Sequence, residues 1–288
     1  MRRYTKAEGY TLVELLIVLA IAGLIGGAIL GVYRVSQDTY IRASSLEAAQ
    51  TGARAGLDRM ANELRLIGSY WVGVSTCAPL PNCNAITAAT PTSITFMANV
   101  DNRSVINGAE ATATSFPAAN SIVLSLTATD TADAFKVYTS SGSALNDWIY
   151  IADGGTRDVK QVSTRSGSTL TLNMNTGNPS VSNLGSIYPV GSLVRDVKTI
   201  TYTRNAGTNT LTRTQGGDTT PDSIVDNVTN LTFTYFNGDI PPVNLGTNPN
   251  TALIREIQID LTVTVVPCSD INGCRRHMTT RVTPRSLP

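Results

Sequence analysis

The sequence predicts an α+β protein in which one long N-terminal helix packs on an antiparallel β-sheet body with long loops. Two observations carry this prediction. An apolar run from Leu12 to Val32 continues into a helical pattern that ends near Ile67. Beyond Gly68, short runs of alternating apolar and polar residues are separated by turn-forming residues, which is the pattern of antiparallel strands.

The first half of the helix, residues 10–33, is predicted to cross a membrane. The run from Leu12 to Val32 holds a single charge, Glu14. At ~1.5 Å per residue it reaches ~30 Å, which is enough to cross the core of a bilayer. Arg2, Arg3 and Lys6 precede the run, and basic flanking residues favour the cytoplasmic side of a membrane. We therefore expect the body to lie outside the cytoplasm.

Two simpler interpretations of this segment fit less well. A secretory signal peptide has an apolar stretch of ~7–15 residues and a small-residue cleavage site after it. Here the run is longer, no Ala-x-Ala site follows it, and the helical pattern continues. A plain membrane anchor does not explain Glu14, because a carboxylate in an apolar span costs ~2.5–3.5 kcal/mol if central and less near the interface. A carboxylate in such a position indicates that it interacts with a partner group.

The second half of the helix, residues 34–67, is predicted to be amphipathic and to pack on the body. One apolar stripe steps by three or four residues through Leu46, Ala49, Ala53, Leu57, Met60, Leu64 and Ile67. Opposite charges four residues apart, such as Arg59 and Glu63, occupy the other faces. We expect one helix from about Thr11 to Ile67, with Gly68 as its stop.

The body, residues 68–288, shows strand patterns without an internal repeat or a domain linker. Strands are predicted over 93–98, 121–127, 147–152, 168–173, 197–204, 230–236 and 255–266. The clearest alternation runs from Ile257 to Val265, and Asn237-Gly238 supplies a turn. The stretches 104–120 and 216–226 are predicted to be loops.

Composition argues for a secreted β-rich body. Among 288 residues only 15% are charged, the net charge is +1, and the body is rich in Thr, Ser, Asn and Gly. The near-neutral charge gives no overall attraction to nucleic acid.

The cysteines form two close pairs, Cys77 with Cys83 and Cys268 with Cys274. Four cysteines can form two disulfides in three different connectivities, and the simplest of these joins the cysteines within each close pair. A zinc site is the competing interpretation, but five intervening residues fit it poorly.

The stretch Gly9-Tyr10-Thr11-Leu12-Val13-Glu14-Leu15-Leu16 resembles the processing signal of type IV prepilins and type II secretion pseudopilins. The resemblance implies that a prepilin peptidase removes the leader, residues 1–9, after Gly9 and methylates the new amine of Tyr10. It implies that Glu14 is the fifth residue of the mature chain. Tyr10 stands where the family usually has Phe. The implied location is the inner membrane with the body in the periplasm, and afterwards a filament, at the cell surface in the case of a pilus.

The family resemblance gives Glu14 a physical role. Cleavage exposes a cationic amine at Tyr10, which Glu14 of the same or a neighbouring subunit can neutralise at reduced dielectric. An unpaired buried charge would cost ~3–5 kcal/mol, so Glu14 would set the register of assembly. Gly23, Gly27 and Gly31 share one helix face, and small residues at this spacing let helices pack closely in lipid.

Stretches of the body resemble a narrower group. Residues 228–238, 254–261 and 280–287 are similar to PilW-like minor pilins and to the J-type pseudopilin of type II secretion. The implied function is a minor pilin that takes part in pilus assembly, at initiation or at the filament tip, with other major and minor pilins as partners. The alternatives are a pseudopilin of a type II secretion system and a ligand-binding tip subunit, either an adhesin or a DNA-binding protein.

The sequence nominates no catalytic residue, no cofactor and no metal site. The single histidine, His277, lacks the neighbours that a catalytic triad or a metal site requires. Acidic residues at 153–155 and 218–226 do not have the spacing of a calcium loop. Arg275, Arg276, Arg281 and Arg285 form a basic C-terminal cluster that could contact DNA or another subunit, although a solvated face is the simpler interpretation.

Overall fold

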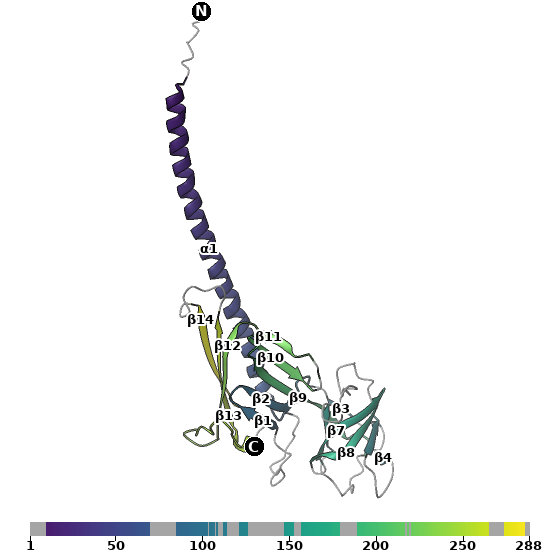
Figure 1. Cartoon of the computed structure of the whole chain (residues 1–288). Coiled ribbons are helices and arrows are strands. Elements are labelled where there is room, and N and C mark those ends of the chain that lie inside the picture. Colours follow the sequence, from purple (N-terminus) through teal and green to yellow (C-terminus); the bar gives the residue numbers. More distant parts are fainter. Residues whose placement is uncertain are drawn as a thin grey trace, which may run out of the picture. The chain divides into compact units, whose positions relative to one another are not determined.

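The computed structural model describes residues 10–69, 85–102, 104–106, 108, 112–113, 121–125, 147–152, 157–178, 189–216, 218, 220–264 and 274–285. The chain divides into two compact units, Met1–Ala48 and Ala49–Pro288. One helix, α1 (Leu12–Arg65), runs through both, and the other elements in the described part of the second unit are β-strands and a short 3₁₀ helix (Figure 1). The predicted α+β class, with one long helix and an antiparallel body, is confirmed.

Both ends of α1 have a structural cause. The hydroxyl of Thr11 accepts a hydrogen bond from the Glu14 N–H at 3.3 Å, which satisfies one of the free donors of the first turn. At the other end, the N–H groups of Leu66 and Ile67 bond to carbonyls three residues back and tighten the last turn. Gly68 follows with φ of 73°, a backbone conformation that glycine adopts without penalty. The predicted stop at Gly68 is therefore confirmed.

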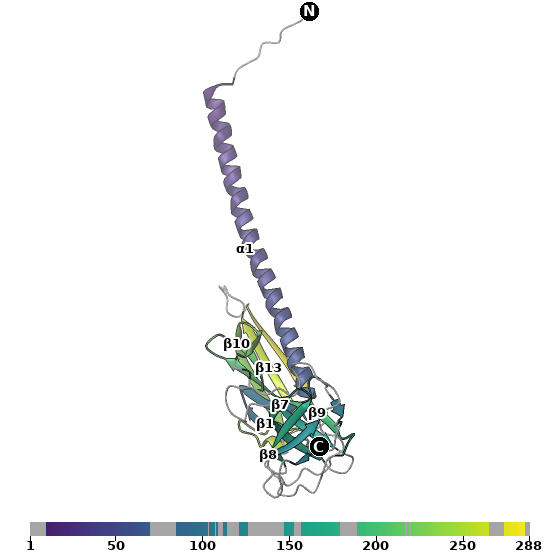
Figure 2. The same ribbon diagram turned by 90° about the vertical axis from the view of Figure 1, so that its right-hand side faces the viewer.

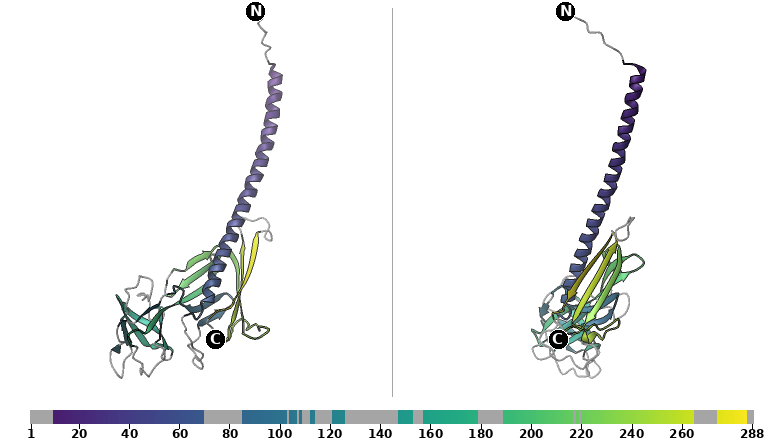
Figure 3. Two further views of the ribbon diagram at one scale, coloured as in Figure 1. Left: turned by 180° about the vertical axis from the view of Figure 1, so that it is seen from behind. Right: turned by 90° about the vertical axis from the view of Figure 1, so that its left-hand side faces the viewer.

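The strands form two antiparallel sheets (Figure 2). The larger one contains β1 (Ile86–Thr90), β2 (Ser93–Ala98), β3 (Ser104–Ile106), β4 (Thr112–Ala113), β5 (Ser121–Ser125), β6 (Trp148–Ala152), β7 (Arg157–Ser166), β8 (Thr169–Asn178), β9 (Leu193–Asn205), β10 (Thr210–Gln215) and β11 (Asp222–Val225). The smaller one has the order β12 (Val228–Phe236), β13 (Glu256–Thr264) and β14 (Arg275–Val282), and its strands lie side by side (Figure 3). A short 3₁₀ helix, η2 (Thr251–Leu253), precedes β13.

Two predicted loops contain strands, so those predictions were wrong in part. β3 and β4 lie within 104–120, and β11 lies within 216–226. These strands are two to four residues long, which is too short for an alternating pattern to stand out. Their partners define them instead, because β3 pairs with β9, β4 with β5 and β11 with β10.

Strand β9 joins the two parts of the larger sheet. Its first half pairs with β3 and β6, and its second half pairs with β2 and β10. The change of partners falls at Val197 and Lys198, since Val197 pairs with Trp148 of β6 and Lys198 pairs with Ala98 of β2. The pairing register of both parts of the larger sheet is therefore set along a single strand, β9.

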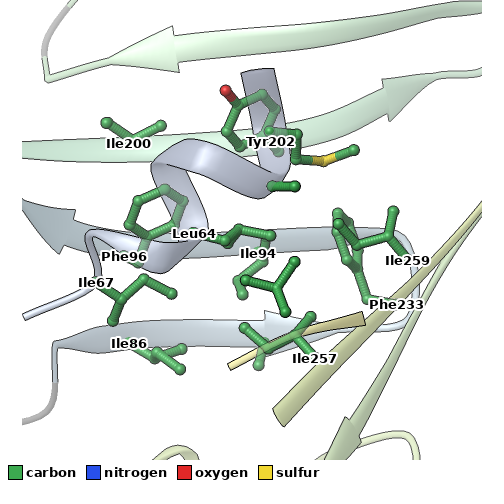
Figure 4. Close-up of a cluster of buried hydrophobic side chains, with 14 of the residues drawn as sticks. Leu64, Ile67, Ile86, Ile94, Phe96, Ile200, Tyr202, Phe233, Ile257 and Ile259 are labelled. Carbon is green, nitrogen blue, oxygen red and sulfur yellow. The ribbon is translucent and has the colours of Figure 1, made fainter. Parts of the chain in front are cut away.

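The C-terminal part of α1 and both sheets share one hydrophobic core (Figure 4). Leu64 and Ile67 are fully buried among side chains of β1, β2, β9, β12 and β13. The predicted stripe is confirmed from Ala53 onward, while Leu46 and Ala49 are half-buried. The predicted alternation of β13 holds throughout its length: Ile257, Ile259, Leu261 and Val263 are buried. The residues beyond Thr264 lie outside the described part of the strand.

Gly56 sets how closely the helix approaches β11. A Cβ atom added at Gly56 would lie 2.2 Å from Cγ2 of Val225 and 3.2 Å from Cγ2 of Ile224. Real Cβ atoms do not approach another heavy atom so closely, and Val225 is itself buried. Only glycine fits at this contact without moving the strand.

A polar clamp, defined here as Glu63, Tyr202, Arg213 and Arg59, adds a directional contact between helix and sheet. The Tyr202 hydroxyl donates to Glu63 Oε2 at 2.8 Å, and Arg213 Nε donates to both carboxylate oxygens, at 3.1 and 2.9 Å. Arg59 completes the set from within α1, at 3.4 Å. The Arg213 side chain is 6% exposed and that of Glu63 14%. Because the ion pair is mostly buried, losing one partner would leave the other charge uncompensated.

The first prediction concerns Gly56. Gly56→Ala should lower the free energy of unfolding of the body by ~1–3 kcal/mol, because the methyl group overpacks against Val225. Gly52→Ala is the matched control, since a Cβ at Gly52 meets nothing within 4 Å. That control should be neutral or stabilising by about 1 kcal/mol or less, through helix propensity. Urea unfolding of the full chain in detergent micelles measures both, and equal stability of the two variants would contradict the close approach.

The second prediction concerns alkaline pH. Burial and the negative charge of Glu63 raise the pKa of Tyr202 above its ordinary value of 10.0, and burial also raises the pKa of Tyr235. The folded chain therefore keeps protons that the unfolded chain loses. The stabilising contribution is complete below pH 10.0 and is lost as the pH rises through the folded-state pKa.

Removing the phenol of Tyr202 should weaken this pH dependence. In Tyr202→Phe, the fall in unfolding free energy between about pH 9 and about pH 11 should be less steep, by up to ~1.4 kcal/mol per pH unit. Tyr40→Phe is the control, because Tyr40 is exposed. Urea titrations across the pH range give the slopes, and a Tyr202→Phe slope equal to that of the unsubstituted chain would refute the assignment.

Candidate functional site

The most unusual surface of the chain is the N-terminal half of α1. Its large apolar side chains are more than half exposed at Leu12, Val13, Leu15, Leu16, Ile17, Val18, Leu19, Ile21, Leu24, Ile25, Ile29, Leu30, Val32, Tyr33, Val35, Tyr40 and Ile41. Contiguous exposed apolar surface of this extent marks a site of contact with protein or membrane. By length and composition, α1 is the one helix in the described part of the chain that could cross a membrane.

The start of this helix carries the residues that the sequence singles out. Tyr10 is 85% exposed, and Glu14 is exposed in the first turn of α1. A carboxylate there is favoured by the positive end of the helix dipole. Gly9 and the rest of the leader lie outside the described residues. The geometry leaves Glu14 accessible to an approaching cation while Thr11 caps the same turn.

The role of Thr11 could have been predicted from the sequence. Thr11-Leu12-Val13-Glu14 has the Ser/Thr-x-x-Glu pattern that marks a helix N-terminus when an apolar run follows it. The observed bond from the Glu14 N–H to the Thr11 hydroxyl is one half of that capping arrangement. Glu14 thus sits at a fixed place in the first turn.

The predicted helix-packing glycines lie on an open surface. A Cβ atom added at Gly23, Gly27 or Gly31 would meet nothing within 4 Å, and the same is true of Gly26. No neighbouring part of the chain, within the residues that the structure describes, therefore explains these glycines. A packing role for them requires a second helix, and that role stays a prediction.

On the outer face of the small sheet, the side chains of His277 and Thr279 both contact Asp260. His277 Nε2 lies 3.5 Å from Asp260 Oδ1, and Thr279 donates to the same oxygen at 2.6 Å. Among the described residues there is no group of three or more potential metal-ligating side chains. Of the acidic stretches, 153–155 falls outside the described residues, and Asp222 of the other lies in β11.

The basic C-terminal residues do not form one continuous patch. Alternation along β14 exposes Arg275, His277 and Arg281 on one face and turns Arg276 toward the other. Arg281 pairs with Glu256 at 3.1 Å, donates to Gln258 at 2.9 Å, and lies over the Phe236 ring at 4.9 Å from its centroid. The alternation of β14 therefore places Arg276 on the opposite face from Arg275 and Arg281, and Arg281 is paired with Glu256.

The cysteines are described at one position. Cys274 is bonded in a disulfide. Cys77, Cys83 and Cys268 lie outside the described residues, so the predicted pairing of Cys77 with Cys83 and of Cys268 with Cys274 stays a prediction.

The comparison with protein families supports the N-terminal interpretation. Residues 4–30 match the family described as the prokaryotic N-terminal methylation motif. In the comparisons with curated proteins and with solved structures, no match to the chain was found. The matched residues include Gly9, Tyr10 and Glu14 and reach into the exposed apolar helix. This motif is the signature of type IV pilins and pseudopilins, and over residues 4–30 the chain is similar to these proteins.

Proposed function

We propose that the chain is a minor pilin, a structural subunit that takes part in assembly of a type IV pilus at its initiation or at its tip. One observation carries the proposal: the methylation motif continues directly into an exposed apolar helix. Within the apolar run of that helix, Glu14 is the only charged residue. Residues 228–238, 254–261 and 280–287 resemble PilW-like minor pilins, and they resemble the J-type pseudopilin of type II secretion as well. The protein acts by assembly and not by catalysis.

In the proposed mechanism, α1 exchanges lipid for the helices of other subunits. Before assembly, residues 10–33 lie in the inner membrane and the body lies in the periplasm. Prepilin peptidase removes residues 1–9 and methylates Tyr10. Because lipid tails are as apolar as leucine, the exchange is driven by packing and by polar contacts more than by the hydrophobic effect. Gly23, Gly27 and Gly31 then supply a surface on which another helix backbone can approach closely.

Glu14 gives this exchange its register. The amine exposed at Tyr10 is cationic near neutral pH, and a carboxylate four residues later can pair with it within one chain or between two chains. In a filament core of low dielectric, a misplaced subunit would bury Glu14 without a cation. Correct axial placement is therefore the arrangement of lowest free energy.

A pseudopilin of a type II secretion system is the second candidate, because pseudopilins share the same signature. Deletion of the gene separates the two functions. Loss of surface filaments and of twitching motility with normal protein secretion supports a pilus subunit. Loss of secretion with intact pili assigns the chain to the secretion system instead.

The third prediction concerns processing. The protein isolated from cell membranes should begin at Tyr10 and carry an N-methyl group, as read by mass spectrometry of its N-terminal peptide. Gly9→Val should leave the leader attached, because the peptidase requires the small residue before the cut. A native protein that still begins at Met1, or that is cut beyond the apolar run, would contradict the proposed function.

The fourth prediction concerns Glu14. Glu14→Leu should be processed normally but enter sheared filaments at least about tenfold less, since tenfold corresponds to ~1.4 kcal/mol and the lost pair is worth more. Glu47→Gln is the matched control, because it removes an exposed acid of the same helix beyond the apolar run. Immunoblots of membranes and filaments give the ratio. Equal incorporation of the two variants would exclude Glu14 from assembly.

A further inference from the structure

A lysine and two aspartates are buried together at the point where β9 changes partners. Lys198, Asp147 and Asp196 each have side chains no more than 1% exposed. The Lys198 ammonium pairs with Asp196 Oδ2 at 2.9 Å and also with Asp147 Oδ2. Charged side chains almost never occur fully buried unless they are paired. The cluster is therefore a built feature of the sheet interior.

Sheet register explains why these three side chains meet. β6 and β9 pair antiparallel with Trp148 opposite Val197, so one further step places Asp147 opposite Lys198. The N–H of Val162 donates to the Asp147 carbonyl at 2.9 Å, which extends the pairing of β7 to the same row. Directly opposed residues have Cβ atoms ~4.5–5.5 Å apart. Asp196 lies two residues before Lys198 and therefore points to the same face.

This arrangement holds the two reactants of an amide bond in contact. An amine and a carboxyl group do not condense in water, where hydration competes and the reverse reaction is favoured. Fixed partners in a buried site behave as if present at effective concentrations of ~10⁵–10⁸ M.

We propose that Lys198 and Asp147 condense into an intramolecular amide cross-link between β9 and the start of β6, with Asp196 relaying the protons. This inference does not rest on the proposed function, because it uses only the interior of the body.

The step balances without an external reactant. Lys198 Nζ attacks Asp147 Cγ, the new bond is C–N, and the bond that breaks joins Cγ to one carboxyl oxygen. Asp196 takes two protons from the nitrogen in turn and passes both to the departing oxygen. An ammonium and a carboxylate thus become one amide and one water, and Asp196 ends as the carboxylate it was.

Asp196 is needed because the starting amine is charged. Burial lowers the pKa of Lys198, but the charges of Asp196 and Asp147 raise it by more, so the net direction is upward. An ammonium has no lone pair for the attack. The second carboxylate, in contact with the ammonium, is placed to accept the proton that must leave first.

The test is a peptide map of the full chain, purified in detergent, reduced and alkylated, and digested with trypsin. The cross-link joins the fragment 137–157 to the fragment 196–204, with Lys198 uncleaved and a mass lower than the sum of the two by one water. Without it, 137–157, 196–198 and 199–204 appear separately. Cleavage after Arg195 and Arg204, which lie on either side of Lys198 in the same strand, is the internal control for digestion.

The native chain decides the proposal by itself, even where a variant fails to fold. Recovery of the joined fragments from most of the protein supports it, and three separate fragments overturn it. Asp196→Asn should abolish or greatly reduce the joined product while keeping both reactants. If Asp196→Asn is joined as fully as the native chain, the relay role of Asp196 is wrong.

Discussion

The exposed apolar surface of α1 constrains where this chain can exist. Between Leu12 and Ile41, large apolar side chains are exposed all around the helix, and a surface of this kind is stable in lipid or against other apolar helices but not in water. Glu14 is costly in the first of these environments unless it lies near the interface. The two requirements together favour a chain that first occupies a bilayer and then finds a cation for Glu14 among helices of its own kind.

The second half of the same helix lies in a different environment from the first half. From Ala53 onward it packs in a dry core, where Gly56 permits close approach to β11 and Glu63 binds Tyr202 and Arg213. Apolar packing alone tolerates sliding of a helix along a sheet, whereas a mostly buried carboxylate with two donor side chains on the sheet does not. The helix therefore changes at about Ala49 from an exposed apolar surface to one that packs in a fixed position.

Sequence reasoning succeeded where a pattern was long and local. The apolar run, the stripe that ends at Ile67 and the alternation of β13 each extend over enough residues to be recognised without a partner. It failed where pairing creates the structure, as in β3 and β11, or where a strand holds few apolar residues, as β7 and β10 do. The clamp of Glu63 with Arg213 and the contact of Asp147 with Lys198 join residues far apart in the chain. No regular spacing of residues in the sequence predicts such pairs.

Both buried charge clusters involve β9, and its topology gives a reason. Tyr202, a member of the polar clamp, lies in the half of β9 that pairs with β2 and β10, and Lys198 lies where β9 changes partner from β6 to β2. A strand shared between two parts of a sheet can slip by two residues without exposing its apolar face, because side chains alternate with a period of two. During folding, before the cross-link forms, a slip of that kind would move Lys198 away from Asp147 and leave both charges buried without partners. Apolar packing alone would not penalise such a slip. Buried charges thus specify the register of β9 more sharply than its valines and isoleucines can.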